Sequence, residues 1–148
     1  MGSFIGREET LSQIDDYFST TDVTCPKVLI LHALGGQGKS QIALKYCQRS
    51  KESHQGIFWI NASSEITTRE AFEGIAAVLD RTSADELGDS DQKIRHVLNT
   101  LGRWRTRWIL VFDNYDWPGE FTSLNKKFFP TSISLYLHYL QSVGYITN

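Results

Sequence analysis

The chain contains few of the residues and segments that are typical of secreted or membrane proteins. It has two cysteines in 148 residues, Cys25 and Cys47, and their spacing fits neither a metal site nor a disulfide framework. The N-terminus lacks the basic region and the apolar run of a signal peptide, and no apolar run approaches the length of a membrane span. We therefore expect reduced thiols, a cytoplasmic location and no membrane partner.

An excess of charge of one sign is also lacking. The net charge is -2, and acidic and basic residues are interspersed without a polybasic patch, so we expect no nucleic-acid partner. The composition, 41% hydrophobic and 22% charged, is that of an ordinary globular protein. The length is sufficient for one domain with a sizeable core.

Short apolar runs alternate with stretches in which apolar residues recur at three- and four-residue spacing. Strands buried on both faces are expected at 28–33, 57–62 and 107–114. Helices are expected at 9–19, 39–49, 72–79 and 94–101. The polar stretch 82–91 is expected to be a loop. This alternation predicts an α/β fold with a mostly parallel sheet and right-handed crossovers.

A glycine-rich turn lies between the first strand and its helix. Residues 35–40 read Gly-Gly-Gln-Gly-Lys-Ser, which is the end of a phosphate-binding loop, although Ala33 stands where the pattern has its first glycine. Glycines allow successive N–H groups to surround an anion, and the helix that follows adds further donors. Lys39 is expected to reach the β- and γ-phosphates and Ser40 to bind Mg²⁺. The alternative is an ordinary strand–helix turn with a surface lysine.

The third strand ends in acidic residues. Asp113 follows five apolar residues, and a carboxylate at the end of a buried strand needs a metal, water or another partner. Ligands bind at the carboxyl ends of parallel strands, where the glycine-rich turn also lies. We expect Asp113 to bind Mg²⁺. Asp116 either orients an attacking water or forms the turn before "WPGE".

These motifs resemble those of the NB-ARC domain of STAND-class signalling ATPases, and most closely those of fungal NLR-like proteins. Four of them occur in the family's order: "FIGRE" at 4–8, the Walker A segment at 31–47, the strand and helix at 57–76, and the Walker B segment at 108–121. The resemblance implies a three-layer P-loop NTPase sandwich, incomplete relative to the family. It also implies ADP or ATP with Mg²⁺ as ligands.

The resemblance assigns a role to each matching residue. Ile5, Gly6 and Arg7 would border the adenine and ribose. The phosphates would be held by Gly35, Gly36, Gln37, Gly38, Lys39 and Ser40. Gln41 and Ile42 would lie near the α-phosphate. Ser40 and Asp113 would hold Mg²⁺, and Asp116 would be the catalytic residue, with Asn114 where plant relatives have a second aspartate.

The resemblance ends near residue 121. We expect a nucleotide-binding domain over 1–121 and a divergent tail over 122–148, in which 132–139 could form a strand or a short helix. The tail contains no arginine to sense the γ-phosphate, so the sequence reads as a truncated gene product or a cut chain.

Three functions remain open from the sequence. The first is an ADP/ATP-binding module of a signalling switch with slow or no hydrolysis, which self-associates or assembles with related NLR-like proteins. The second is a non-functional or decoy remnant of such a protein. The third is a turnover ATPase or a small-molecule kinase. Any enzymatic activity would be at most that of a weak Mg²⁺-dependent ATPase.

Overall fold

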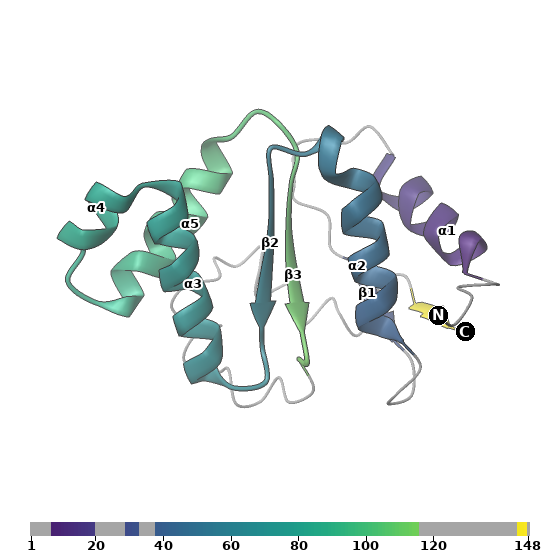
Figure 1. The fold of residues 1–148 in the computed structure, drawn as a ribbon, viewed down its shortest axis with the longest axis horizontal. Helices are drawn as coiled ribbons and strands as arrows, with labels where there is room; N and C mark the ends of the chain where they lie inside the picture. Colours follow the sequence, from purple (N-terminus) through teal and green to yellow (C-terminus); the bar gives the residue numbers. More distant parts are fainter. Residues whose placement is uncertain (1–6, 20–28, 33–37, 116–144, 148) are drawn as a thin grey trace. The chain divides into compact units, whose positions relative to one another are not determined.

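A computed structural model describes residues 7–19, 29–32, 38–115 and 145–147. Helices and strands alternate along these residues, as the α/β prediction requires (Figure 1). The chain divides into two compact units, one formed by 1–49 and 135–148 and the other by 50–134. We call them the first and the second unit and describe each by itself.

The described residues of the first unit form two helices and two short parallel strands. Strand β1 (Ile30–His32) pairs with β4 (Tyr145–Thr147), with Ile30 opposite Tyr145. Helix α1 (Glu8–Ser19) packs on α2 (Lys39–Ser50) through the stacked rings of Phe18 and Tyr46, whose centroids are 5.7 Å apart. The buried side chains of this unit include Leu11, Ile14, Ile42 and Tyr46.

Over residues 50–115, the described part of the second unit, the chain forms a parallel strand pair and three α-helices. After a 3₁₀ turn (Lys51–Ser53), β2 (Gly56–Asn61) pairs in parallel with β3 (Trp108–Asp113). The register runs from Gly56 opposite Trp108 to Asn61 opposite Asp113. The crossover between the strands carries α3 (Glu65–Leu79), α4 (Arg81–Glu86) and α5 (Ser90–Arg103). Parallel strands need such a crossover, and its helices are available to cover one face of the sheet.

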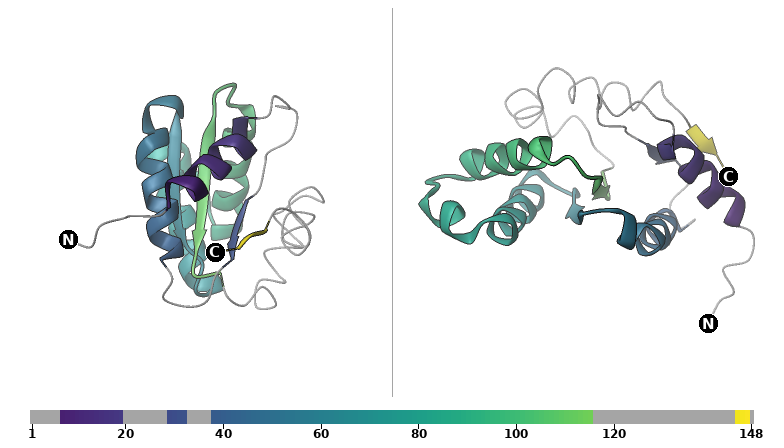
Figure 2. Two further views of the ribbon diagram at one scale, coloured as in Figure 1. Left: turned by 90° about the vertical axis from the view of Figure 1, so that its right-hand side faces the viewer. Right: turned by 90° about the horizontal axis from the view of Figure 1, so that it is seen from above.

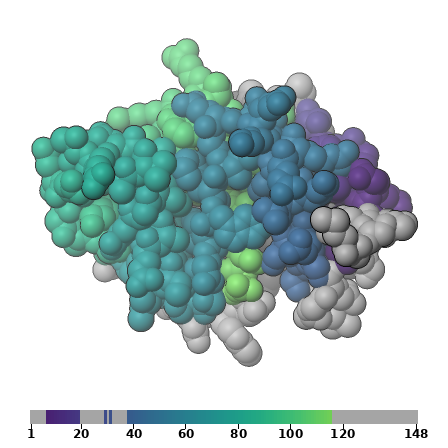
Figure 3. Space-filling model, in the orientation of Figure 1, coloured from purple at the N-terminus to yellow at the C-terminus, as the bar shows by residue number. Residues whose placement is uncertain are grey.

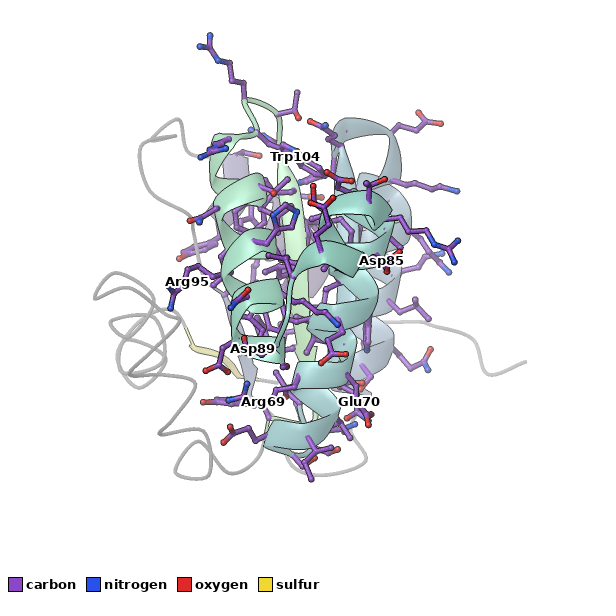
Figure 4. The ribbon with its side chains drawn as sticks, turned by 90° about the vertical axis from the view of Figure 1, so that its left-hand side faces the viewer. Arg69, Glu70, Asp85, Asp89, Arg95 and Trp104 are labelled. Carbon is purple, nitrogen blue, oxygen red and sulfur yellow. The ribbon has the colours of Figure 1, made fainter. Side chains whose placement is uncertain are left out.

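Helices α3 and α5 lie side by side over one face of this strand pair (Figures 2 and 4). Side chains alternate along a strand, so Phe58 and Phe112 belong to the same face. On that face the centroid of the Phe112 ring lies 6.4 Å from that of Phe72 on α3, and that of Phe58 lies 6.2 Å from that of Trp104 after α5. The fully buried core of the unit contains Ile60, Phe72, Ile94, Val97 and Leu101.

A partly buried ion-pair cluster joins α3 to α5 (Figure 4). The Arg69 guanidinium donates to Glu65 one turn earlier on α3, at 2.8 Å, and to Asp91 in the first turn of α5. Burial disfavours the charged form of Arg69, but the hydrogen bonds to Asp91 and Glu65 outweigh it and raise the pKa of Arg69. The cluster orients the two helices that form the layer on the strands.

The expected loop over 82–91 is wrong at both ends, because residues 90–91 begin α5 and residues 82–86 belong to α4. The Asp80 side chain accepts a hydrogen bond from the Ser83 N–H at 3.2 Å, which caps the helix, and Ala84 buries its methyl group. A cap and one buried residue stabilise a helix this short, and neither produces an apolar stripe. Hydrophobic periodicity therefore could not predict α4, because the helix is short and has no apolar stripe.

The expectation that the strands are buried on both faces is only partly correct. Ile60 is 0% exposed, whereas Trp59 and Phe112 each keep 38% of their surface exposed. The described sheet of the second unit has two strands, so each side chain on it has a neighbouring strand on one side only. Residues 28 and 33, the two ends of the first expected strand, lie outside the described residues. The segment 132–139, which was expected to form a strand or a short helix, also lies outside them.

Candidate functional site

The described part of the glycine-rich turn is its last glycine. Gly38 has φ +78°, a left-handed conformation that glycine adopts at little cost. Helix α2 begins at the next residue, and the Gly38 carbonyl accepts the Ile42 N–H at 3.0 Å in the first turn. The expected residues Gly35, Gly36 and Gln37 lie outside the described residues. What is described is a left-handed glycine directly before a helix, whose first N–H groups favour an anion.

The first turn of α2 carries the remaining residues assigned to the phosphates. Lys39 and Ser40 are half-buried and Gln41 is exposed. Ile42 is 4% exposed, so its side chain belongs to the core of the first unit. Lys39 and Ser40 lie within one turn of a helix N-terminus, where backbone N–H groups and the helix dipole favour anions.

Arg7 and Glu8 are the residues of the "FIGRE" motif that the structure describes, and Arg7 contacts the glycine-rich turn. Its Nη1 donates to the Gly38 carbonyl at 3.5 Å. A Cβ atom placed on Gly38 would lie 3.3 Å from the same nitrogen, so the guanidinium is packed against this glycine. The motif residues Ile5 and Gly6 lie outside the described residues. The structure therefore brings Arg7 and Gly38 together in the first unit.

Asp113 is the last residue of β3, as the sequence predicts, and it is half-buried. Its Oδ1 accepts the Asn114 N–H at 3.1 Å, and its main-chain oxygen accepts the Ala62 N–H at 2.7 Å. Asn114 has φ +61°, which turns the chain sharply at the strand end. These bonds orient the carboxylate at the carboxyl end of the sheet. Asp116 lies outside the described residues.

Asn61 was not singled out from the sequence, although it ends β2 directly opposite Asp113. Facing residues of paired parallel strands lie on the same side of the sheet, so both polar side chains are at one corner. The Asn61 Oδ1 accepts the Ser63 N–H at 3.2 Å, which shapes the turn into α3. The sequence contained one indication of this role, since Asn61 is a polar residue directly after an apolar run.

The oxygen donors assigned to Mg²⁺ are of the right chemical kind. A hydroxyl and a carboxylate, as supplied by Ser40 and Asp113, are hard ligands that suit this ion, which is otherwise bound by phosphate oxygens and water. Within the described ranges, no group of three or more His, Cys, Asp or Glu residues could hold a metal by itself.

Cys47 is a free, buried thiol, and burial raises its pKa. A raised pKa leaves less of the reactive thiolate, in keeping with a reduced structural cysteine. None of the helices in the described ranges is long and apolar enough to cross a membrane.

Comparisons with known proteins support the resemblance seen in the motifs. The family model described as NB-ARC domain matches residues 7–118. A protein named "Nucleotide-binding leucine-rich repeat (NLR)-like protein", from Hyaloscypha variabilis (strain UAMH 11265 / GT02V1 / F), is 28% identical over 119 residues, which cover 76% of this chain. The chain spans 12% of the length of that relative. No solved structure matches the chain.

The family match includes sequence from both units and begins at Arg7, the residue that contacts the glycine-rich turn. It confirms the α/β class of P-loop NTPases, with parallel strand pairs and crossover helices. The chain belongs to the NB-ARC family of nucleotide-binding domains.

Proposed function

We propose that the chain is the ADP/ATP-binding module of a STAND-type signalling switch, with slow or no hydrolysis. The observation that carries this proposal is the start of α2, where a left-handed Gly38 precedes Lys39 and Ser40 in a chain that matches the NB-ARC family. Backbone donors, a helix dipole and a lysine together favour a polyphosphate.

Each part of the nucleotide has proposed ligands. The loop 35–40 surrounds the phosphates, with Lys39 on the β- and γ-phosphates, and Gln41 and Ile42 lie near the α-phosphate. Ile5, Gly6 and Arg7 line the adenine and ribose, as the family resemblance implies. Ser40 and Asp113 complete the Mg²⁺ ligands.

Slow hydrolysis is proposed because the three exposed arginines that precede β3 lie at the end of that strand opposite to Asp113. Arg103, Arg105 and Arg107 belong to the end of α5 and the turn that projects before β3 (Figure 3). Asp113 lies six residues after Arg107, which in a strand is about 20 Å. An arginine at the transferring phosphate is worth about 10³–10⁵ in rate. Asp116 remains the proposed water-positioning residue, and without such an arginine its contribution would be small.

The partners proposed for this module follow from the family. Self-association, or assembly with related NLR-like proteins in the cytoplasm, would convert nucleotide exchange into a signal. Nucleic acid and membranes are not among the proposed partners. The decoy remnant differs from the switch in one respect that can be measured, because a remnant would fold without binding nucleotide.

The test is a calorimetric titration of the chain with ADP and ATP in the presence of Mg²⁺. We expect binding of both, and a loss of about ten- to a hundredfold in affinity in Lys39→Ala, since the lysine makes a charge-assisted contact. Lys45→Ala is the matched control, because Lys45 is an exposed lysine further along the same helix.

A folded chain that binds neither nucleotide would contradict the proposal and support the remnant. Phosphate release distinguishes the switch from an enzyme. We expect a rate well below about 1 s⁻¹, the low end of ordinary turnover. Sustained turnover above that rate would favour the ATPase or kinase.

A further inference from the structure

The segment between α5 and β3, which we call the arginine turn, carries a cluster of positive charge. Arg103, Arg105 and Arg107 are all exposed, and the turn projects from the surface of the second unit (Figure 3). None of the three forms an ion pair with another residue of the described ranges. The half-buried Trp104 and Trp108 alternate with them. Arginine and tryptophan are the residue types that are enriched at protein interfaces, so this turn has the composition of a binding surface.

Contacts with the start of β2 hold the backbone of the arginine turn in place. The Gln55 N–H donates to the Arg107 carbonyl at 2.8 Å, and the Thr106 hydroxyl donates to the side-chain oxygen of Gln55. Trp104 packs on Gly56, where an added Cβ would lie only 2.8 Å from the indole ring. The arginines are therefore carried by an ordered backbone, which reduces the entropy that is lost when they bind a partner.

The position and the size of the cluster indicate the kind of partner. The turn precedes β3, about 20 Å from Asp113 at the other end of that strand, so a partner bound there leaves Asp113 accessible. Three arginines are few for nucleic acid, since DNA-binding proteins often contact about 6–10 phosphates. A guanidinium binds a carboxylate through two parallel hydrogen bonds. The matching partner is an acidic protein surface with a similar number of carboxylates.

Helix α1 is an acidic surface of this kind. Its acidic residues are Glu8, Glu9, Asp15 and Asp16. Among the helices that the structure describes, it is the one without a lysine or an arginine. Glu8 pairs with Arg49 at 3.0 Å, whereas the other three are exposed and have no ion pair in the described part of the chain. Three carboxylates on α1 thus correspond to three guanidinium groups on the arginine turn.

The two sets of charges also have similar spans. Glu9 lies seven residues before Asp16, which is about 10 Å along a helix. Arg103 and Arg107 are four residues apart, so their Cα atoms are separated by at most about 14 Å. Helix α1 is itself held in place, because it buries an apolar face and stacks an aromatic ring on α2. Both surfaces can therefore meet without rearrangement of either backbone.

We propose that the arginine turn binds the acidic surface of α1 on a second copy of this chain. The contact is heterologous, because the turn and the helix are different surfaces, and each copy can therefore engage two neighbours. The inference rests on the self-association named in the proposed function and adds the surfaces that make it. Exposed ion pairs are individually weak and are screened by salt, so the association is weak and salt-dependent.

The experiment measures the self-association of the whole chain by sedimentation equilibrium in low salt, about 20 mM, and in high salt, about 500 mM. The turn variant is Arg105→Glu with Arg107→Glu, and the helix variant is Asp15→Lys with Asp16→Lys. We expect the parent to associate in low salt, and high salt or either variant to weaken this association at least about tenfold. An equimolar mixture of the two variants should associate again, because each acidic surface then finds a basic one on the other chain.

Arg81→Glu with Arg95→Glu is the matched control. It removes two exposed arginines of the second unit that lie outside the turn, and it changes the net charge by the same amount. Arg95 is labelled on α5 in Figure 4. We expect this control to associate within about threefold of the parent, since the general repulsion between chains of higher net charge is screened beyond about 10 Å.

Four results would overturn the inference. The parent chain could be monomeric in low salt, the control could lose as much association as the turn variant, or the mixture of variants could remain monomeric. A single-stranded oligonucleotide that binds the parent and not the turn variant would assign the arginines to nucleic acid instead.

Two further measurements keep these outcomes distinct. If the helix variant does not fold, the turn variant decides, because a turn variant that associates as the parent does contradicts the proposal. We expect all folded variants to bind ADP as the parent does, by calorimetry. A parent chain that associates but binds no nucleotide refutes the nucleotide-binding part of the proposed function and leaves this contact standing.

Discussion

The conformation of a single residue, Gly38, determines how the glycine-rich turn enters α2. Its φ of +78° strains any residue with a Cβ, which costs about 1–2 kcal/mol in the left-handed region. An added Cβ would also lie 3.3 Å from the Arg7 guanidinium, a flexible side-chain end that can move aside. We expect Gly38→Ala to lower the free energy of unfolding by about 1–2 kcal/mol and to weaken ADP binding, as measured by urea denaturation and titration.

Gly74→Ala is the control for that change and should have the opposite sign. Gly74 lies inside α3 and is exposed, and a Cβ there would meet nothing within 4 Å. Alanine in a helix interior is favoured over glycine by about 0.5–1 kcal/mol, so this variant should be more stable than the parent. Equal unfolding midpoints for Gly38→Ala and the parent would show that the left-handed conformation carries no strain.

At the residue scale, the sequence predicted the positions of residues that local motifs determine, but it did not predict contacts between residues that are distant in the sequence. The place of Gly38 before a helix and of Asp113 at a strand end followed from motif spacing. The contact between Arg7 and Gly38 joins residues 31 positions apart, and no spacing rule predicts it. The alignment of Asn61 with Asp113 likewise depends on strand register, which is set by pairing and not by either segment alone.

At the element scale, Asp80 connects two helices. At the end of α3, the Asp80 N–H donates to the Ala76 carbonyl at 3.0 Å. At the start of α4, the Asp80 carboxylate accepts two hydrogen bonds from Ser83, one from the hydroxyl at 2.6 Å and one from the N–H. The bonds from Ser83 lower the pKa of Asp80 below its ordinary value of 3.8. A lowered pKa stabilises the folded chain above the unfolded pKa, and this stability is lost as the pH falls through the folded value.

We therefore expect a difference in pH dependence between the parent chain and Asp80→Asn. The asparagine keeps an acceptor for the cap but does not titrate. The advantage of the parent in unfolding free energy should be constant above about pH 5 and should shrink below about pH 4, near the ordinary aspartate pKa. Denaturation series at several pH values measure it, and a difference that grows on acidification would contradict the assignment.

The elements themselves were predicted where they are long and periodic. Helices α3 and α5 bury residues spaced three and four apart, such as Phe72 with Ile75 and Val97 with Leu101, and these stripes were visible in the sequence. Helix α4 has only six residues and one buried alanine, so its stability depends on the cap at its N-terminus. The start of α3, 72 in the prediction, is Glu65 in the structure, because Ser64 and Thr67 form a capping box ahead of the stripe.

At the scale of the whole molecule, the family match extends from residue 7 to 118 and so includes sequence from both units. A domain of one family is expected to unfold cooperatively, and a ligand that binds only the folded state raises its stability by mass action. We expect one thermal transition, shifted upward by ADP with Mg²⁺. At a hundredfold excess over the dissociation constant the gain is about 2.7 kcal/mol, or about 5–10 °C for a chain of this size.

The role proposed for Asp113 predicts which part of that shift depends on the metal. Asp113→Asn keeps the size of the side chain and an oxygen that can accept the Asn114 N–H, but removes the charge that would hold Mg²⁺. We expect the variant to retain the shift given by ADP with a chelator and to lose the increment that Mg²⁺ adds. Asp85→Asn, an exposed aspartate on α4, is the control and should keep the full increment. If Asp113→Asn also keeps it, Mg²⁺ is held by the nucleotide and other residues, and the assignment of Asp113 fails while nucleotide binding stands.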